Sequence, residues 1–396
     1  MKKITHIDCF SGPGGICTGF KAAGLETILA IELVESCVDT YKANHKDVPI
    51  INQDISKVTK EEILNIIGDQ EVDILSSGMP CETFSTAGAT SRASYDGRQH
   101  LYREAIRVAG IVDAKMILFE NVPGFQNKRI SKESDRFILD DLYQDLEESG
   151  YRYHIKTVLN AMDFGVPQAR NRFFVLASKE ERNLKIPSPI EGEYISVSEA
   201  LSDLPSVEHG LEYVGNEFTS DQTDYAALMK DKSFWKMDND NEEVKLTYHI
   251  PPKHRPKSLE RFSLIEQGEG LKNLFFKFPE EEVLRLQEEK ILPKKWYIQR
   301  NRRLFGNKPA VTVTSHCLDE LLHPIENRAL TVREVARLQS FPDLYDFKGG
   351  PMVCPHNDAR QDKYEQIGDA VPPLLAYHWG LTIKNILIEQ VLEEVR

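Results

Sequence analysis

The sequence predicts an α/β protein that combines a mostly parallel sheet with a second, smaller domain. Short apolar runs alternate with amphipathic segments through residues 4–177, which is the pattern of a parallel sheet covered by helices. After Ser178 this rhythm gives way to polar, proline-containing sequence up to about residue 322. A chain of 396 residues can also hold one large core and a smaller one. We therefore expect a first domain over residues 1–182, completed by residues 355–396, and a second domain over residues 183–354.

The expected elements follow from this pattern in order. Strands are expected at residues 4–10, 27–31, 49–51, 72–76, 116–119, 153–159 and 172–177. Helices are expected from a glycine-rich turn to about residue 23 and at residues 37–44, 60–67, 103–112, 134–149, 328–339 and 377–395. Open α/β sheets place their ligands at the carboxyl ends of their strands. The residues that follow the strands are therefore the first candidates for a functional site.

The composition is typical of a globular protein, with 41% hydrophobic and 28% charged residues. The six cysteines are scattered without a CxxC pair, which favours reduced thiols in a cytoplasmic protein. The N-terminus enters a predicted strand at once and no apolar run could span a bilayer, so we expect no signal peptide and no membrane partner. Cys354-Pro355-His356 has no second half with zinc spacing, and no metal site is expected.

The net charge of −13 argues mildly against a nucleic-acid partner, because phosphate contacts need lysine and arginine. Basic residues are nevertheless concentrated in the last third of the chain, at residues 253–261 and 294–308, where aromatic residues interleave with them. Each run taken alone is more typical of a solvated face than of a binding patch.

The most informative stretch is a turn that follows the strand at residues 72–76, with the sequence Ser77-Gly78-Met79-Pro80-Cys81-Glu82-Thr83-Phe84-Ser85. Pro80 fixes its own φ and biases Met79 towards an extended conformation, so the next side chain points in a defined direction. A cysteine on such a turn is placed to act as a nucleophile. A lone cysteine is more often a buried structural residue, and the nucleophile is favoured here because other segments supply its partners.

A glycine-rich turn follows the first strand, with Phe10, Gly12, Gly14 and Gly15. Such glycines let a ligand approach the backbone and the amino end of a helix. Cys17 stands where the dinucleotide fingerprint has a further glycine, so a different nucleoside cofactor is favoured. Glu32 and Asp54 end the next two strands, where they could bind ribose hydroxyls and an exocyclic amine. Each alone could equally be a surface acid or a helix cap.

Two further segments complete the candidate site. Glu120 ends the fifth strand, beside the strand that leads to Cys81, and partial burial there would raise the pKa of its carboxyl and let it donate a proton. Gln168, Arg170 and Arg172 begin the last strand, and alternation places them on one face. Arginines there could hold a base carbonyl or a phosphate, although a surface ion pair is the simpler interpretation.

Together these motifs resemble the DNA (cytosine-5) methyltransferase family. They occur in the same order as in that family, and the main segment without a matching motif is residues 180–305. The matching stretches are Phe10-Ser11-Gly12-Pro13-Gly14-Gly15, Pro80-Cys81, Glu120-Asn121-Val122, the Gln168, Arg170 and Arg172 triplet, residues 328–342, and Gly368-Asp369-Ala370-Val371-Pro372-Pro373.

The resemblance implies a Rossmann-like methyltransferase sheet with a target-recognition domain, S-adenosyl-L-methionine as cofactor, and a cytosine flipped out of double-stranded DNA. It implies that Cys81 attacks C6, that Glu120 protonates N3, that Arg172 holds O2 and that Arg170 helps to fix the pocket. The cofactor residues that it implies are Phe10, Gly12, Gly14, Gly15, Glu32, Leu33, Asp54, Ile55, Pro80, Asp369 and Val371. The DNA contacts that it implies are Ser85, Arg92, Arg98, Gln168, Arg302, Arg303, Thr312 and Thr314.

The chain departs from the family pattern at Met79, Glu82 and Asp369, where Pro, Gln and Asn are commoner, and Glu82 could raise the pKa of the neighbouring thiol. Three alternatives stay open: a tRNA cytosine-5 methyltransferase, a catalytically silent DNA-binding regulator, and an NAD-dependent oxidoreductase. The basic insert before Pro309 favours DNA over tRNA, the presence of Cys81 and Glu120 disfavours the regulator, and Cys17 disfavours the oxidoreductase. We expect a bacterial modification enzyme, in the cytoplasm or nucleoid, with no obligatory protein partner.

Overall fold

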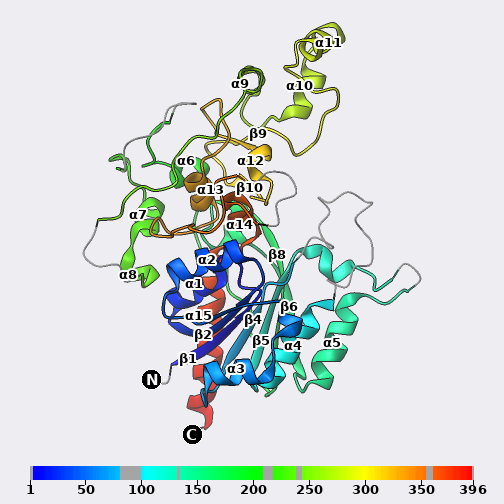
Figure 1. Ribbon diagram of the computed structural model, residues 1–396, viewed down its shortest axis with the longest axis vertical. Helices are drawn as coiled ribbons and strands as arrows, with labels where there is room; N and C mark the ends of the chain where they lie inside the picture. Colours follow the sequence, from blue (N-terminus) through cyan, green and yellow to red (C-terminus); the bar gives the residue numbers. More distant parts are fainter. Residues whose placement is uncertain are drawn as a thin grey trace.

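The core of the protein is a seven-stranded sheet, seen in a computed structural model that describes residues 3–80, 100–131, 134–207, 217–237, 243–353 and 360–394. The order across the sheet is β3-β2-β1-β4-β5-β8-β6, and β8 runs antiparallel to both of its neighbours (Figure 1). The strands are β1 (Ile4–Cys9), β2 (Leu25–Glu32), β3 (Ile50–Asn52), β4 (Ile74–Ser77), β5 (Met116–Asn121), β6 (Tyr153–Asn160) and β8 (Asn171–Ser178). The predicted α/β class with a mostly parallel sheet is thus confirmed.

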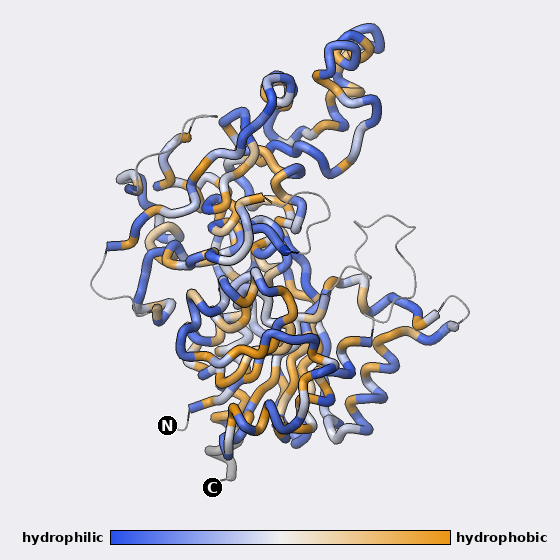
Figure 2. The backbone as a smooth tube through the Cα atoms, viewed as in Figure 1, coloured by the Kyte–Doolittle hydropathy of each residue, from blue (hydrophilic) through white to orange (hydrophobic). Residues whose placement is uncertain are grey.

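Helices cover both faces of this sheet because successive residues of each buried strand point to opposite sides. In β4, Ile74 packs towards the face that carries α1 (Gly15–Ala23) and α15 (Pro373–Glu394), and Leu75 packs towards the other face. That other face carries α3 (Lys60–Ile67), α4 (Tyr102–Ile111) and α5 (Ile138–Glu148). Figure 2 shows the hydrophobic residues following the strands between these layers.

The predicted elements of the first half match these strands and helices closely. The helix expected at residues 134–149 begins later, at Ile138. The remaining elements of this half are α2 (Glu35–Asn44), β7 (Gln168–Ala169) and the short 3-10 helices η1 (Ile55–Lys57), η4 (Pro123–Asn127) and η5 (Ala161–Phe164).

The later part of the chain is built from short elements, most of which lie above the sheet in Figure 1. They are α6 (Val197–Ala200), α7 (Asp224–Lys230), α8 (Lys232–Trp235), α9 (Pro256–Ser263), α10 (Leu271–Lys277), α11 (Glu280–Glu288), β9 (Arg302–Arg303), β10 (Ala310–Val311), α12 (Cys317–Glu320), β11 (Leu321–Leu322), α13 (Val332–Leu338) and α14 (Lys363–Asp369). The helix expected at residues 328–339 is therefore α13, which is shorter.

The apolar cores bear on the expected domain boundary, which stays a prediction. Residues from α9, α10 and α11 form a small core of their own around Leu271, Leu274 and Leu286. By contrast, Trp235 and Val335 belong to the same core as the α1 and α15 face of the sheet. The second half thus combines a separately packed tip, formed by α9 to α11, with segments that complete the core of the first half.

Among the helices of the described ranges, none has the length and apolar character needed to cross a bilayer. Nor do His, Cys, Asp and Glu residues of those ranges gather in threes as a metal ion would require.

Candidate active site

The carboxyl ends of β1, β4 and β5 meet at one place on the rim of the sheet. The Gly78 N–H donates to the Cys9 carbonyl (3.3 Å), which joins the turns after β4 and β1. A Cβ on Gly78 would lie 3.7 Å from the Phe10 carbonyl oxygen and 3.8 Å from Oε2 of Glu120. The structure therefore brings the Phe10 backbone and the Glu120 carboxylate together beside Gly78, two residues before Pro80.

Cys81, the predicted nucleophile, lies outside the described residues. It directly follows Pro80, the last described residue of this stretch. Asn121 donates to the Met79 carbonyl (3.4 Å), and this contact ties the end of β5 to the turn before Pro80.

Glu120 and Arg172 form an ion pair at this rim. The two residues come from the antiparallel neighbours β5 and β8, and Arg172 Nε lies 2.8 Å from Glu120 Oε1. The side chain of Arg172 is only 11% exposed, and that of Glu120 is 9% exposed. Burial raises the pKa of the Glu120 carboxyl, while Arg172 and Arg170 act in the opposite direction. A buried carboxyl of this kind can hold or release a proton in response to its surroundings.

Arg170 and Gln168 are buried beneath the rim, where they join distant segments. The Arg170 guanidinium donates to the carbonyls of Val313, Gly368 (2.8 Å) and Ala370 (3.2 Å). Gln168 donates to the Leu338 carbonyl (2.8 Å) and accepts from the Val313 N–H (3.0 Å). Gln168 has no exposed surface in this structure, and its predicted contact with DNA stays a prediction. Arg170 joins the start of β8 to residues 313, 368 and 370, and its predicted role in the pocket stays a prediction as well.

The glycine-rich turn folds tightly around the carboxylate of Glu32. Phe10 and Gly12 both have positive φ, 60° and 53°, a conformation that is uncommon for phenylalanine and easy for glycine. Glu32 accepts from the N–H groups of Gly12 and Val34, each at 2.8 Å. Burial raises the pKa of this carboxyl, and the two backbone N–H groups oppose the shift.

The other two glycines of the turn permit close packing, and their predicted contact with the cofactor stays a prediction. A Cβ on Gly15 would lie 2.3 Å from the Val371 carbonyl oxygen, and one on Gly14 would lie 2.7 Å from His45 Nε2 and 2.8 Å from the Tyr345 hydroxyl. That hydroxyl donates to the Pro13 carbonyl from below the turn. Tyr345 and His45 are therefore supports that the sequence analysis missed, because nothing in the local sequence connects them to residues 10–15.

The residues expected around an adenosine group surround the ends of β2 and β3. Leu33 is 63% exposed beside Glu32. Asp54 is partly exposed, and hydrogen bonds from Ser56 hold the pKa of its carboxyl below the ordinary value, so it stays an acceptor. The Ile55 side chain is buried. Asp369 is exposed and accepts from Gln361, which in turn accepts from the Cys37 thiol of α2 (2.9 Å). Acceptors at two strand ends, around a turn of bare glycine backbone, fit a nucleoside with a ribose diol and an amine.

The predicted DNA contacts fall into three groups. Ser85, Arg92 and Arg98 lie outside the described residues. Thr312 donates to the Ala169 carbonyl (2.7 Å), Thr314 donates to Glu320 (2.6 Å), and Arg302 donates to Gln299 (3.1 Å). Arg303 is buried, and its guanidinium donates to four carbonyls and to the Asn327 side chain. Arg303 therefore holds the tip together in this structure, and its predicted contact with DNA stays a prediction.

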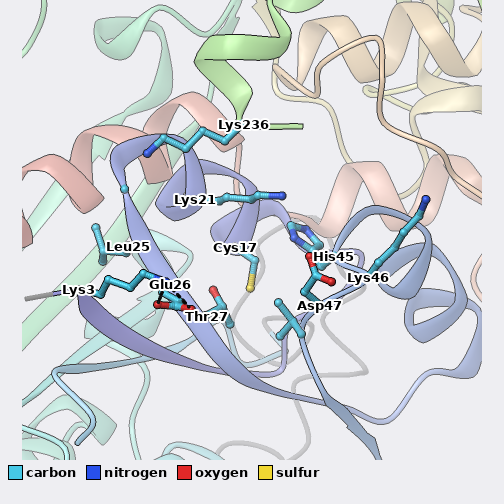
Figure 3. Close-up of a pocket in the computed structure, with 12 residues that line it drawn as sticks. Lys3, Cys17, Lys21, Leu25, Glu26, Thr27, His45, Lys46, Asp47 and Lys236 are labelled. Atoms are coloured by element: carbon cyan, nitrogen blue, oxygen red, sulfur yellow. Dashed lines mark hydrogen bonds and ion pairs between the residues drawn. The ribbon is translucent and has the colours of Figure 1, made fainter. Parts of the chain in front are cut away.

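A cavity of about 320 Å³ lies near the amino ends of the strands, opposite the rim (Figure 3). It is lined by residues at the amino ends of β1 and β2 and at the carboxyl ends of α1 and α2, with Lys236 above them. Burial and the nearby Lys384 and Lys21 lower the pKa of Lys236. None of the residues expected to bind cofactor or cytosine lines this cavity, so it is separate from the rim site.

Comparisons with known proteins match nearly the whole chain to DNA methylases. The model of the C-5 cytosine-specific DNA methylase family matches residues 4–385. Type II methyltransferase M.DdeI from Desulfomicrobium norvegicum is 34% identical over 378 residues, which cover 93% of this chain and 86% of the relative. Type II methyltransferase M1.HphI from Haemophilus parahaemolyticus is 30% identical over 374 residues, which cover 94% of this chain and 84% of the relative.

Solved structures share the fold. One, described as a DNA modification methyltransferase encoded within an E. coli prophage, matches with a TM-score of 0.73 at 23% identity and covers 98% of this chain and 100% of that chain. The methyltransferase EhMeth from Entamoeba histolytica matches with a TM-score of 0.56 at 14% identity and covers 98% of this chain and 99% of that chain. At these identities the likeness concerns the fold alone.

Proposed function

This chain belongs to the C-5 cytosine-specific DNA methylase family and is an S-adenosylmethionine-dependent DNA (cytosine-5-)-methyltransferase, and on that premise we propose that it methylates one specific duplex site as the modification enzyme of a type II restriction-modification system. Two relatives that carry the type II description align over more than nine tenths of the chain, which supports this biological role. The ion pair between Glu120 and Arg172 at the rim is the observation that carries the chemical part of the proposal.

In this proposal the target cytosine leaves the duplex and binds between Cys81 and Glu120. The Cys81 thiolate adds to C6 while the Glu120 carboxyl gives its proton to N3, so that no full negative charge builds up on the ring. Arg172 lies against Glu120 and would hold the base O2 with its remaining N–H groups. The addition makes C5 nucleophilic. C5 would then take the methyl group as its bond to the sulfonium sulfur breaks, and the sulfur would keep the electron pair as a neutral thioether. Return of the N3 proton to Glu120, loss of the C5 proton to a base and departure of the Cys81 thiolate would restore the aromatic ring.

The cofactor supplies an electrophilic methyl group on a sulfonium sulfur when it is bound. Glu32 and Asp54 would accept hydrogen bonds from its ribose diol and adenine amine, and the Phe10 ring would stack beside it. Glu32 already accepts from Gly12 and Val34, so the carboxylate would hold the turn in shape while a free lone pair receives the ribose.

The decisive experiment measures methyl transfer and its product together. Purified protein is incubated with tritiated S-adenosylmethionine and with duplex DNA or tRNA, and DNA from cells that express the chain is sequenced after bisulfite treatment. We expect methylation of DNA at one recurring sequence, abolished by Cys81→Ser and retained by Cys317→Ser, which exchanges a buried cysteine of α12. Methyl transfer to tRNA alone, or wild-type activity in Cys81→Ser, would refute the proposal.

A further inference from the structure

Four large apolar side chains are exposed next to one another on the tip of the molecule, and we call them the aromatic strip. Phe276 on α10 is 69% exposed, and Trp296, Tyr297 and Ile298 in the loop between α11 and β9 are 38%, 57% and 62% exposed. Every residue from 294 to 300 is exposed. Adjacent exposed apolar side chains of this size are typical of an interaction surface.

The strip is not the result of a missing core. The tip, formed by α9 to α11 and distant from the sheet in Figure 1, has its own buried cluster, which includes Leu271, Leu274 and Leu292. None of the four strip residues belongs to that cluster. Phe276 and Trp296 meet edge to face, with ring centroids 5.9 Å apart. They are therefore held in place on the outside of a packed unit.

Cations accompany the strip. Lys272 Nζ lies 5.0 Å from the Trp296 ring centroid and 5.8 Å from that of Phe276, and the Arg300 guanidinium lies 5.7 Å from that of Tyr297. Lys294 and Lys295 precede Trp296 and are exposed. In a chain with a net charge of −13, this local excess of positive charge favours a polyanionic partner.

Three of the nearby arginines are bound within the protein. Arg303 is buried among backbone carbonyls, and Arg300 is paired with Asp319 (2.8 Å). Arg261 donates to Asn301 and to the Ile291 carbonyl. A bidentate contact from any of these three to guanine, the commonest specific contact in the major groove, would require these bonds to break. Arg302, by contrast, donates to Gln299 at the surface, and the exposed lysines and apolar side chains of the strip lie nearby without such bonds to break.

We propose that the aromatic strip reads the DNA by apolar contact with thymine methyl groups in the major groove, while Lys272, Lys294 and Lys295 bind the flanking phosphates. This inference rests on the proposed function. The thymine C5-methyl is the apolar group that a base edge presents in the grooves, so it is the part of the duplex that an aliphatic or aromatic surface can recognise by sequence. Phosphate contacts from the lysines would position the strip without adding specificity.

The test removes methyl groups from the DNA and leaves the protein unchanged. Once bisulfite sequencing has given the recognition site, binding of the wild-type protein is measured on duplexes in which each thymine of the site is exchanged in turn for uracil. We expect at least one exchange to weaken binding about 5- to 20-fold, equivalent to about 1–2 kcal/mol. In Ile298→Ser or Trp296→Ala, binding should already be weaker and the same exchange should have little further effect.

Two control variants separate the reading of thymine methyl groups from other effects on DNA binding. Ile325→Ser changes a side chain that is 77% exposed outside the strip and should bind both duplexes as wild type does. Lys294→Gln should weaken binding to both duplexes equally and reduce the salt dependence. Because the exchanged side chains are exposed, all four variants should unfold at the wild-type temperature.

The inference and the proposed function fail in different ways. If the wild-type protein transfers no methyl group to DNA, the proposed function is wrong. If it methylates DNA but its recognition site contains no thymine, or every uracil exchange leaves binding unchanged, the methyl-reading role of the strip is overturned. Strip variants that bind and methylate DNA as wild type does would overturn it as well.

Discussion

Replacement of Arg172 by methionine tests whether Glu120 and Arg172 act as one unit. The two side chains meet at 2.8 Å and are almost fully buried. Two unit charges about 4 Å apart attract each other by about 4 kcal/mol at an effective dielectric constant near 20. Removal of one member of a buried pair leaves the other charge uncompensated, at a cost of about 3–5 kcal/mol. We therefore expect Arg172→Met to lose about 3 kcal/mol of unfolding free energy at pH 8.

This loss should depend on pH in a definite direction. Burial already raises the pKa of Glu120, and without Arg172 it should rise further. Between the ordinary pKa of a glutamate and the raised value, the folded protein binds more protons than the unfolded chain. Stability therefore falls as pH rises through this window. The deficit of Arg172→Met relative to the wild type should be larger at pH 8 than at pH 5, because more of the Glu120 carboxyl is protonated and uncharged at the lower pH.

Urea unfolding at pH 5, 6, 7 and 8 measures this deficit. The double variant Glu120→Gln with Arg172→Met carries neither charge. Its loss of unfolding free energy relative to the wild type should therefore not grow with pH as that of the single variant does. In single-turnover methyl transfer, the alkaline limb of the pH profile of Arg172→Met should move to higher pH. A deficit of equal size at pH 5 and pH 8 would show that Arg172 contributes packing and not charge.

Three other expected outcomes follow from the same contacts. Tyr345→Phe removes the hydrogen bond to the Pro13 carbonyl, worth about 1 kcal/mol, so initial rates should show a KM for S-adenosylmethionine raised about 5-fold with kcat little changed. Gly15→Ala would place a methyl 2.3 Å from the Val371 carbonyl oxygen, so its unfolding free energy, measured with urea, should fall by about 2–3 kcal/mol. The control Gly110→Ala lies in α4, where a Cβ would meet nothing within 4 Å, and its unfolding free energy should rise by up to about 1 kcal/mol. Arg170→Met leaves three buried carbonyls without their donor and should lose at least about 3 kcal/mol, while Arg302→Met at the surface should stay within about 0.5 kcal/mol.

Local patterns made the strands and the rim predictable. The apolar runs located each strand of the sheet, and the ordering of strand ends placed Glu120 beside the turn that leads to Cys81. Both depend on residues within a few positions of one another, and the strand period is fixed by the pleat. The position of Glu32 at the end of β2 was predictable for the same reason.

The direction of the motif side chains was not predictable in this way. Gln168, Arg170 and Arg303 are polar residues in stretches that resemble a DNA-binding family, and a surface role was expected for Gln168 and Arg303. Their partners are backbone carbonyls and amides up to 200 positions away in the chain, such as the Ala370 carbonyl for Arg170. No local pattern shows that these acceptors exist. A motif therefore indicates which residues matter without indicating whether they face a ligand or the interior.

The rim site depends on the end of the chain as much as on the strands that form it. Gly15 and Gly19 lie in α1, where a Cβ would meet the backbone at Val371 and at Pro373 and Tyr377, so the backbones of α1 and the start of α15 are in direct contact. Tyr345 reaches the Pro13 carbonyl, and Arg170 reaches the carbonyls of residues 368 and 370. The Gly15 and Tyr345 contacts reach the glycine-rich turn directly, while Arg170 holds residues 368 and 370 next to Val371. The shape of the turn therefore depends on the C-terminal segment packed against it, which explains why the final motif of the sequence lies beside the first.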